Sequence, residues 1–254
     1  MRHCRTTSDH RDDSVGVWCD HSAPRRGRAA SPQVACRDTS VPGIRTHDPD
    51  EPTMLVYVLD VYDPWSWAYL PSVGTVLEAA CPVVEVEVVI AGRHDGASVS
   101  ALAQSVEAVR SGTGTRFGTG FLRELESGQL ALDSARAAAG IIGLLAADQR
   151  RHVSTVLRAV QREFFLHGRT VDSPGVLGNV ASQLSLDGPA IEVFAASERA
   201  REMAVEDFAV AVDLDPDLRP LLIASHGGTV FEFDGLGASG DRLVDQFRSV
   251  LARP

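Results

Sequence analysis

The sequence predicts an α/β protein in which β-α-β, a large helical insertion and β-β-α follow one another along the chain. Three observations support this order. A short apolar run of β-forming residues precedes a capped helix, a long central stretch repeats its apolar residues at helical spacing, and two short β runs flank a glycine turn near the C-terminus. The first half requires a parallel, right-handed crossover and the second half an antiparallel hairpin, so we expect a mixed sheet.

The β-α-β half has clear boundaries. Leu55–Leu59 reads Leu-Val-Tyr-Val-Leu, which is typical of a buried strand. Asp63 is a good N-cap and Pro64 suits the first helical position, where its missing N–H costs nothing, so a helix is expected over about residues 65–80. Residues 83–90 alternate Val and Glu at their start and predict the second strand.

A helical insertion is expected over about residues 97–212. Apolar residues recur there at the three- and four-residue spacing of a helix that faces a core, as in Val153, Val156, Leu157, Val160 and Phe164. Asp172-Ser173-Pro174 predicts a fresh helix start within the insertion, because it repeats the cap-then-proline pattern.

The end of the chain returns to β structure. Pro220–Ala224 predicts a strand, His226-Gly227-Gly228 a hairpin turn and Thr229–Phe233 the antiparallel partner. A final helix is expected from about Ser239 to Leu251.

The domain organisation separates residues 1–53 from residues 54–252. The first segment is rich in Arg, Asp, Ser, Thr and Pro, and it has too few aliphatic residues to offset the entropy of ordering, so we expect disorder. The abrupt change at Met54 also fits a mis-called start of translation. Residues 54–252 are expected to form one domain.

Charge and cysteine content restrict the function. The first 53 residues carry equal numbers of basic and acidic groups, so the whole net charge of −10 lies in the remainder. Nucleic acid and anionic membranes need a basic surface, and we expect neither as a partner. Cys81 is the lone cysteine after residue 53, which suits a reducing compartment. No apolar run reaches about 18 residues and no signal segment opens the chain, so we expect a cytoplasmic protein.

The turn before the first helix carries a family resemblance. Residues 60–67 read Asp-Val-Tyr-Asp-Pro-Trp-Ser-Trp. They resemble the Asp-x-x-Cys-x-Trp-Cys motif, followed by an aromatic residue, of the cytosolic DsbA family, which includes FrnE-like proteins. Kappa-class glutathione transferases and 2-hydroxychromene-2-carboxylate isomerases are similar more remotely. In this alignment Asp63 and Ser66 stand in place of the two redox cysteines.

The resemblance implies a thioredoxin-like fold. Phe117–Phe121 and Phe164–Arg169 resemble the helical insertion of the family. Leu218–Leu222 falls where the family has a cis proline just before the third strand, so the resemblance implies a cis Pro220 opposite the first helix.

Asp63 and Ser66 are the predicted catalytic residues, although neither can perform disulfide exchange. A redox cysteine at a helix N-terminus is stabilised as a thiolate by the dipole and the free N–H groups, and its partner resolves the mixed disulfide. A carboxylate and a hydroxyl do neither. Asp63 is either a helix cap or a carboxylate that orients a substrate, and Ser66 is either a reactive hydroxyl or a solvated residue of the first turn.

Four further residues are predicted to bind a ligand. Trp65 and Tyr62 are expected to form apolar walls for a small aromatic molecule. Pro220 would expose the preceding backbone for β-like pairing with a peptide or thiol ligand. Arg219 is either a solvated side chain or the partner of Asp63 in an ion pair across the site.

Three functions remain open. The first is a non-redox enzyme, of the tailoring or isomerase type, that acts on a small molecule. The second is a pseudo-oxidoreductase that binds peptides as an adaptor or chaperone-like module. The third is a kappa-type enzyme with a thiol cofactor, which is disfavoured because the carboxylate of Asp63 would repel a thiolate. The sequence has no HExxH, CxxC, P-loop or GxGxxG pattern, so neither metal nor nucleotide is expected.

Overall fold

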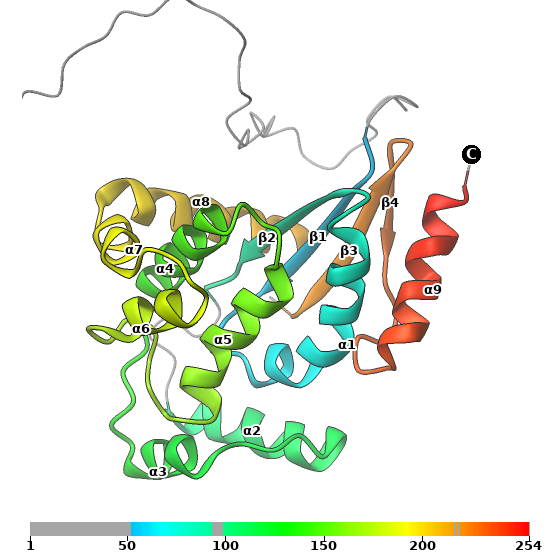
Figure 1. Cartoon of the computed structure of the whole chain (residues 1–254). Coiled ribbons are helices and arrows are strands. Elements are labelled where there is room, and N and C mark those ends of the chain that lie inside the picture. Colours follow the sequence, from blue (N-terminus) through cyan, green and yellow to red (C-terminus); the bar gives the residue numbers. More distant parts are fainter. Residues whose placement is uncertain (1–51, 93–98, 216, 218, 254) are drawn as a thin grey trace, which may run out of the picture. The chain divides into compact units, whose positions relative to one another are not determined.

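The structure is a computed structural model that describes residues 52–92, 99–215, 217 and 219–253 (Figure 1). All of these residues belong to one compact unit formed by residues 45–254. Disorder was expected over residues 1–53, and of these residues 1–51 lie outside the described residues. Within the described part of the chain, no helix is both long and apolar enough to cross a membrane.

A four-stranded mixed sheet lies at the centre of the described domain. Its strands are β1 (Met54–Leu59), β2 (Glu85–Ile90), β3 (Leu221–His226) and β4 (Thr229–Glu232), in the spatial order β2-β1-β3-β4. Strand β1 pairs in parallel with β2 and antiparallel with β3, and β3 and β4 form a hairpin. Gly227 and Gly228 make the two-residue turn of this hairpin with φ values of 53° and 71°, which glycine adopts without strain. The predicted mixed sheet is confirmed.

Both faces of β1 are buried, which explains its continuous apolar sequence. Leu55, Tyr57 and Leu59 belong to the main core, which also contains the apolar side chains of α1 (Pro64–Ala80) and α9 (Gly240–Leu251). Val56 and Val58 belong to a second, smaller core with Ala211 of α8 (Glu198–Leu214). Successive side chains of a strand point to opposite faces, so one run of apolar residues fills both layers.

The helical insertion extends from α2 to α8, between β2 and β3. Its first six helices are α2 (Val99–Thr113), α3 (Thr119–Ser127), α4 (Ser134–Ala147), α5 (Val153–Phe165), α6 (Val176–Gln183) and α7 (Gly188–Ala195). Helix α5 packs against α1, and α4 packs against α7 and α8 (Figure 1). The aromatic rings of Phe117, Phe121, Phe164 and Phe165 contact one another at centroid distances of 4.9–5.7 Å and join α3 to α5.

The predicted helix start at Asp172-Ser173-Pro174 is wrong. Helix α6 begins at Val176, and residues 171–175 form turns and a bend. The carboxylate that was expected to cap the helix is used elsewhere, because Asp172 Oδ1 accepts a hydrogen bond of 2.8 Å from the hydroxyl of Tyr62. A contact between residues this far apart in sequence overrides the local capping pattern.

Gly118 permits a close approach between two parts of the insertion. Its N–H donates to the carbonyl of Phe165 at 2.9 Å, and a Cβ at this position would overlap the backbone of Leu166. At Gly112, near the end of α2, a Cβ would meet only an ordinary contact of 3.7 Å with the Trp65 ring. The structure therefore requires glycine at position 118, whereas position 112 can accommodate a Cβ.

We predict that Gly118→Ala lowers the free energy of unfolding by about 1–3 kcal/mol, because the backbone of Leu166 has to move. The control, Gly112→Ala, leaves stability unchanged or raises it by up to about 1 kcal/mol through the better helix propensity of alanine. Urea denaturation followed by circular dichroism measures both values. Equal effects of the two substitutions would contradict the close approach at Gly118.

Candidate ligand-binding site at the start of helix α1

Asp63 caps α1 and is enclosed with Ser66 beneath the helix start. Asp63 Oδ2 accepts one hydrogen bond from the Ser66 N–H at 2.9 Å and another from the Ser66 hydroxyl at 3.1 Å. The exposed fractions of the two residues are 1% and 0%. The capping role predicted for Asp63 is confirmed, and the alternative that Ser66 is solvated is wrong. Neither side chain is exposed to solvent. Their catalytic roles stay predictions.

Tyr57 lies under the same turn and is fully buried. Burial raises the pKa of its hydroxyl above the ordinary value, and the nearby carboxylate of Asp63 raises that pKa further. The phenol is therefore neutral at neutral pH. Tyr57, Asp63 and Ser66 together form a closed polar cluster between β1 and α1.

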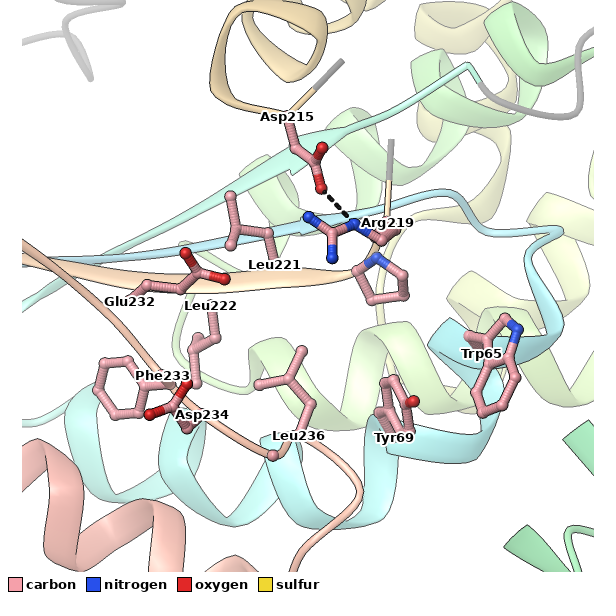
Figure 2. Close-up of a pocket in the computed structure, with 12 residues that line it drawn as sticks. Trp65, Tyr69, Asp215, Arg219, Leu221, Leu222, Glu232, Phe233, Asp234 and Leu236 are labelled. Atoms are coloured by element: carbon pink, nitrogen blue, oxygen red, sulfur yellow. Dashed lines mark hydrogen bonds and ion pairs between the residues drawn. The ribbon is translucent and has the colours of Figure 1, made fainter. Parts of the chain in front are cut away.

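An open pocket of about 440 Å³ lies beside this cluster, and we refer to it as the α1–β3 pocket. Figure 2 shows Trp65 and Tyr69 of α1 on one side and Asp215 and Arg219, from the segment between α8 and β3, on the other. The remaining lining residues come from the start of β3 with the proline before it, and from the end of β4 with the segment after it: Pro220, Leu221, Leu222, Glu232, Phe233, Asp234, Gly235 and Leu236.

Aromatic rings form the α1 side of the pocket. Trp65 and Tyr69 are four residues apart and therefore lie on the same face of the helix, with ring centroids 5.5 Å apart. Partial burial raises the pKa of the Tyr69 phenol, and the carboxylate of Asp63 contributes to the shift. At neutral pH, Tyr69 is consequently a hydrogen-bond donor at the pocket.

The opposite side of the pocket is polar and has more negative than positive groups. Arg219 Nε lies 3.0 Å from Asp215 Oδ2 and 4.0 Å from Asp217 Oδ2. In this ion pair the carboxylate of Asp215 is buried, whereas the Arg219 side chain is exposed to solvent. Glu232 and Asp234 add two exposed carboxylates to the lining. The single guanidinium is thus already neutralised.

The structure brings together three of the six predicted site residues. Trp65, Arg219 and Pro220 line one pocket, although Trp65 lies more than 150 residues before the other two in sequence. The expected ion pair between Arg219 and Asp63 is not formed, because the guanidinium is paired with Asp215 and Asp217. Those acidic residues lie four and two residues before Arg219, in the segment that follows α8.

Tyr62 was predicted to be a wall of the site, and this prediction is wrong. Its side chain is fully buried, its ring makes an edge contact with Phe164 at 4.7 Å, and its hydroxyl accepts a hydrogen bond from the Val171 N–H at 3.1 Å. With the hydroxyl also donating to Asp172, Tyr62 fastens the turn before α1 to the insertion. Burial raises the pKa of this hydroxyl as well.

Pro220 lies at the pocket, but the cis bond implied by the resemblance is absent. No peptide bond between described residues is cis, so the bond from Arg219 to Pro220 is trans. The trans form is the more stable isomer of an X–Pro bond by about 0.5–1 kcal/mol.

Sequence reasoning missed Tyr69, Asp215 and Glu232. Tyr69 could have been found from its spacing of four residues from Trp65 on the predicted helix. The carboxylates of Asp215 and Glu232 reach the pocket because β3 and β4 pair in the sheet beside β1, and no local sequence pattern predicts this position.

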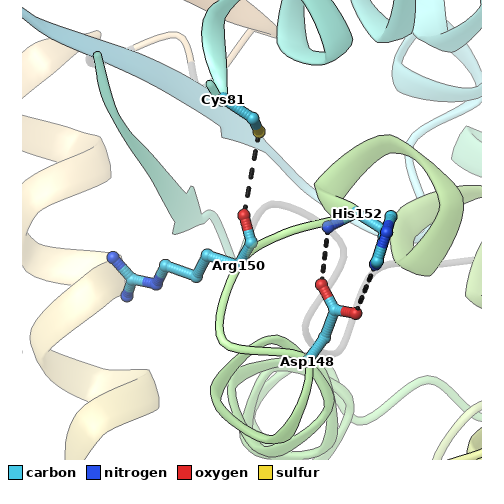
Figure 3. Close-up of polar contacts among 4 residues, drawn as sticks. All are labelled: Cys81, Asp148, Arg150 and His152. Atoms are coloured by element: carbon cyan, nitrogen blue, oxygen red, sulfur yellow. Dashed lines mark hydrogen bonds and ion pairs between the residues drawn. The ribbon is translucent and has the colours of Figure 1, made fainter. Parts of the chain in front are cut away.

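Cys81 lies at the other end of α1 from Asp63, where it forms the C-cap. Its Sγ is 3.7 Å from the carbonyl oxygen of Arg150, and His152 beside it is paired with Asp148 at 2.9 Å (Figure 3). Burial raises the pKa of the Cys81 thiol, and the carboxylates of Asp148 and Glu78 add to this effect. The thiol is therefore a poor nucleophile. Among the described residues, no cluster of three or more His, Cys, Asp or Glu could hold a metal ion.

Stability should fall at alkaline pH because of Tyr57 and Tyr62. Their folded-state pKa values are raised above the unfolded value of about 10, so their contribution is fully present below about pH 10 and is lost as the pH rises further. Each contributes a slope of about 1.4 kcal/mol per pH unit above that point. Urea denaturation from neutral to alkaline pH should show this slope reduced in Tyr57→Phe and in Tyr62→Phe. An unchanged slope in both variants would contradict it.

Comparison with known proteins agrees with the observed architecture. The cytosolic disulfide reductase DsbM from Pseudomonas aeruginosa superimposes with a TM-score of 0.66 at 18% identity, over 78% of this chain and 98% of DsbM. DsbM with GSH gives 0.65 at 18% identity, over 79% and 100%. A probable DsbA oxidoreductase from Streptomyces coelicolor gives 0.52 at 16% identity, over 80% and 91%. No protein-family model and no curated protein matches the sequence. The predicted fold is confirmed: this chain has a DsbA-like thioredoxin fold.

Proposed function

We propose that this chain is a non-redox small-molecule enzyme, of the isomerase or tailoring type, whose substrate binds in the α1–β3 pocket. The observation that carries the proposal is the position of this pocket. It opens beside the capped start of α1 and joins the aromatic pair of that helix to polar groups from three later segments. Ligand sites in proteins commonly combine such apolar walls with a few convergent polar groups.

Disulfide exchange does not fit the residues at this position. The resemblance aligns Asp63 and Ser66 with the redox cysteines of the DsbA family, and neither side chain carries sulfur. Cys81 is a whole helix away from them, and its raised pKa disfavours the thiolate. Within the described residues there is no second cysteine with which it could form a disulfide.

The lining favours a neutral aromatic substrate that carries a carbonyl or hydroxyl group. The rings of Trp65 and Tyr69 offer flat apolar contact. An anionic ligand would meet the carboxylates of Glu232 and Asp234, whereas the guanidinium of Arg219 is already paired with carboxylates. Hydroxyl groups of a neutral ligand can donate hydrogen bonds to the same carboxylates.

The available groups suit proton transfer next to a carbonyl. Tyr69 keeps its proton at neutral pH and can donate a hydrogen bond to a substrate carbonyl oxygen. Glu232 can remove a proton from the adjacent carbon, so that the electrons of that C–H bond form a carbon–carbon double bond and the carbonyl π electrons move to the oxygen, giving an enolate that the Tyr69 hydrogen bond stabilises. Return of the proton to the same carbon or to another one completes exchange or isomerisation.

The adaptor and the thiol-cofactor functions remain alternatives, and each predicts a different ligand in the binding test. DsbM has been solved with GSH, and a similar thiol in this chain would have to approach the carboxylate end of Asp63. A peptide would have to extend beyond the α1–β3 pocket along Pro220. Glutathione and an unfolded peptide are therefore included in the test.

The test uses 2-tetralone, a neutral aromatic ketone with exchangeable protons next to its carbonyl. We predict that the full chain binds it and accelerates proton–deuterium exchange in D₂O, followed by proton NMR against a protein-free control. Trp65→Ala should weaken binding about tenfold through lost ring contact. Tyr69→Phe and Glu232→Gln should keep most of the binding and lose about a hundredfold in exchange rate, the size expected of a general acid or base.

Arg248→Ala is the matched control for Arg219→Ala, because both arginines are exposed and each is paired with an aspartate. Only the Arg219 variant should change 2-tetralone binding. Binding without accelerated exchange would reject the enzyme and favour a binding module. Tighter binding of glutathione or of the peptide than of 2-tetralone would favour the corresponding alternative.

A further inference from the structure

A second hollow lies on the other side of α1, and we refer to it as the arginine pocket. It measures about 450 Å³ and is lined by four residues of α1, two residues of the segment between α2 and α3, and two residues of α5: Trp67, Ala68, Leu70, Pro71, Thr115, Arg116, Arg158 and Arg162. A helix turns by about 100° per residue, so Trp67 and Pro71 project away from the face that carries Trp65 and Tyr69. The two pockets are therefore separate sites (Figure 1 shows α5 beside α1).

Three guanidinium groups converge on the arginine pocket from two elements. None of the ion pairs among the described residues includes Arg116, Arg158 or Arg162. The lining contains no acidic residue, in a chain whose net charge is −10. The pocket is thus a local concentration of positive charge on a protein that otherwise repels anions.

Helix α5 places two of these charges side by side without compensating them. Arg158 and Arg162 are one turn apart, where like charges repel by about 0.2–0.5 kcal/mol. The one acidic residue of α5, Glu163, is buried and paired with Arg169. The helix dipole favours a cation at Arg162 in the last turn, but it does not account for Arg158 or Arg116.

The third guanidinium is brought to the same place by a contact with α1. The indole Nε1 of Trp67 donates a hydrogen bond of 3.2 Å to the carbonyl oxygen of Arg116. One face of the indole is supported by Phe165, whose ring stacks on it at 5.6 Å with an interplanar angle of 21°. Trp67 therefore has a fixed orientation and offers a rigid aromatic surface beside the arginines.

We infer that the arginine pocket binds a small aromatic molecule that carries a phosphate or a similar group with about two negative charges. Guanidinium groups bind phosphate oxygens through paired, charge-assisted hydrogen bonds. Trp67, Leu70 and Pro71 provide the apolar contact for the ring of the ligand. The inference is independent of the function proposed for the α1–β3 pocket, because it uses none of the residues of that pocket.

The experiment titrates the full-length chain with phenyl phosphate in an isothermal calorimeter at low salt. Phenol and inorganic phosphate serve as the two halves of the probe, and each is expected to bind at least about tenfold more weakly than phenyl phosphate. The double variant Arg158→Ala/Arg162→Ala should lose about a hundredfold in affinity, or about tenfold for each guanidinium, equal to about 1.4 kcal/mol each. Affinity should also fall as salt is raised.

Two control variants and one further pocket variant, Arg116→Ala, keep the result interpretable. The double variant Arg199→Ala/Arg248→Ala removes the same charge from exposed arginines outside the pocket and should bind like the wild type. The single variant Arg116→Ala changes a residue outside the helices and should lose about tenfold in affinity without a change in melting temperature. Trp65→Ala should have no effect.

Three results would overturn the inference. The first is the absence of measurable phenyl phosphate binding to the wild-type chain at millimolar concentration. The second is equal loss of affinity in the pocket and control double variants, which would reveal a general charge effect. The third is loss of binding in Trp65→Ala or Arg219→Ala, which would place the ligand in the α1–β3 pocket.

Discussion

The hydrogen bonds from Ser66 to the carboxylate of Asp63 hold the start of α1, the helix that lines both pockets. They join Ser66 in the first turn of α1 to Asp63 in the turn that connects β1 to this helix. With the start of the helix in place, its turn of about 100° per residue directs the next side chains to two different sides. Trp65 and Tyr69 face one pocket, and Trp67 and Pro71 face the other.

The same cap changes the chemistry expected from a DsbA-like fold. In a thiol enzyme the helix start presents a reactive group, whereas here the Asp63 carboxylate accepts two hydrogen bonds from Ser66 and is buried with Tyr57. The open α1–β3 pocket lies at the side of the helix start. The two pockets also differ in charge, since one has an excess of carboxylates and the other has three guanidinium groups. They are consequently suited to ligands of different charge.

Much of the fold could be predicted because its signals are local. The apolar run of β1, the cap at Asp63 and the glycine turn before β4 each act within a few residues. Tyr62 and Arg219 could not be placed in this way. The buried hydroxyl of Tyr62 donates a hydrogen bond to Asp172, which lies 110 residues away in sequence, and Arg219 pairs with Asp215 instead of Asp63. Long-range partners compete for polar groups, and a sequence pattern does not show which partner wins.

A double-mutant cycle on Asp63→Ala and Ser66→Ala, measured by urea denaturation, tests the closed cap most directly. The cap predicts that the two substitutions are coupled by about 1–2 kcal/mol, because each removes the hydrogen bond between the Ser66 hydroxyl and the Asp63 carboxylate. It also predicts that Ser66→Ala keeps the exchange activity toward 2-tetralone, since the hydroxyl is turned inward to Asp63. Additive effects on stability, together with loss of exchange in Ser66→Ala, would contradict it and would make Ser66 a reactive group.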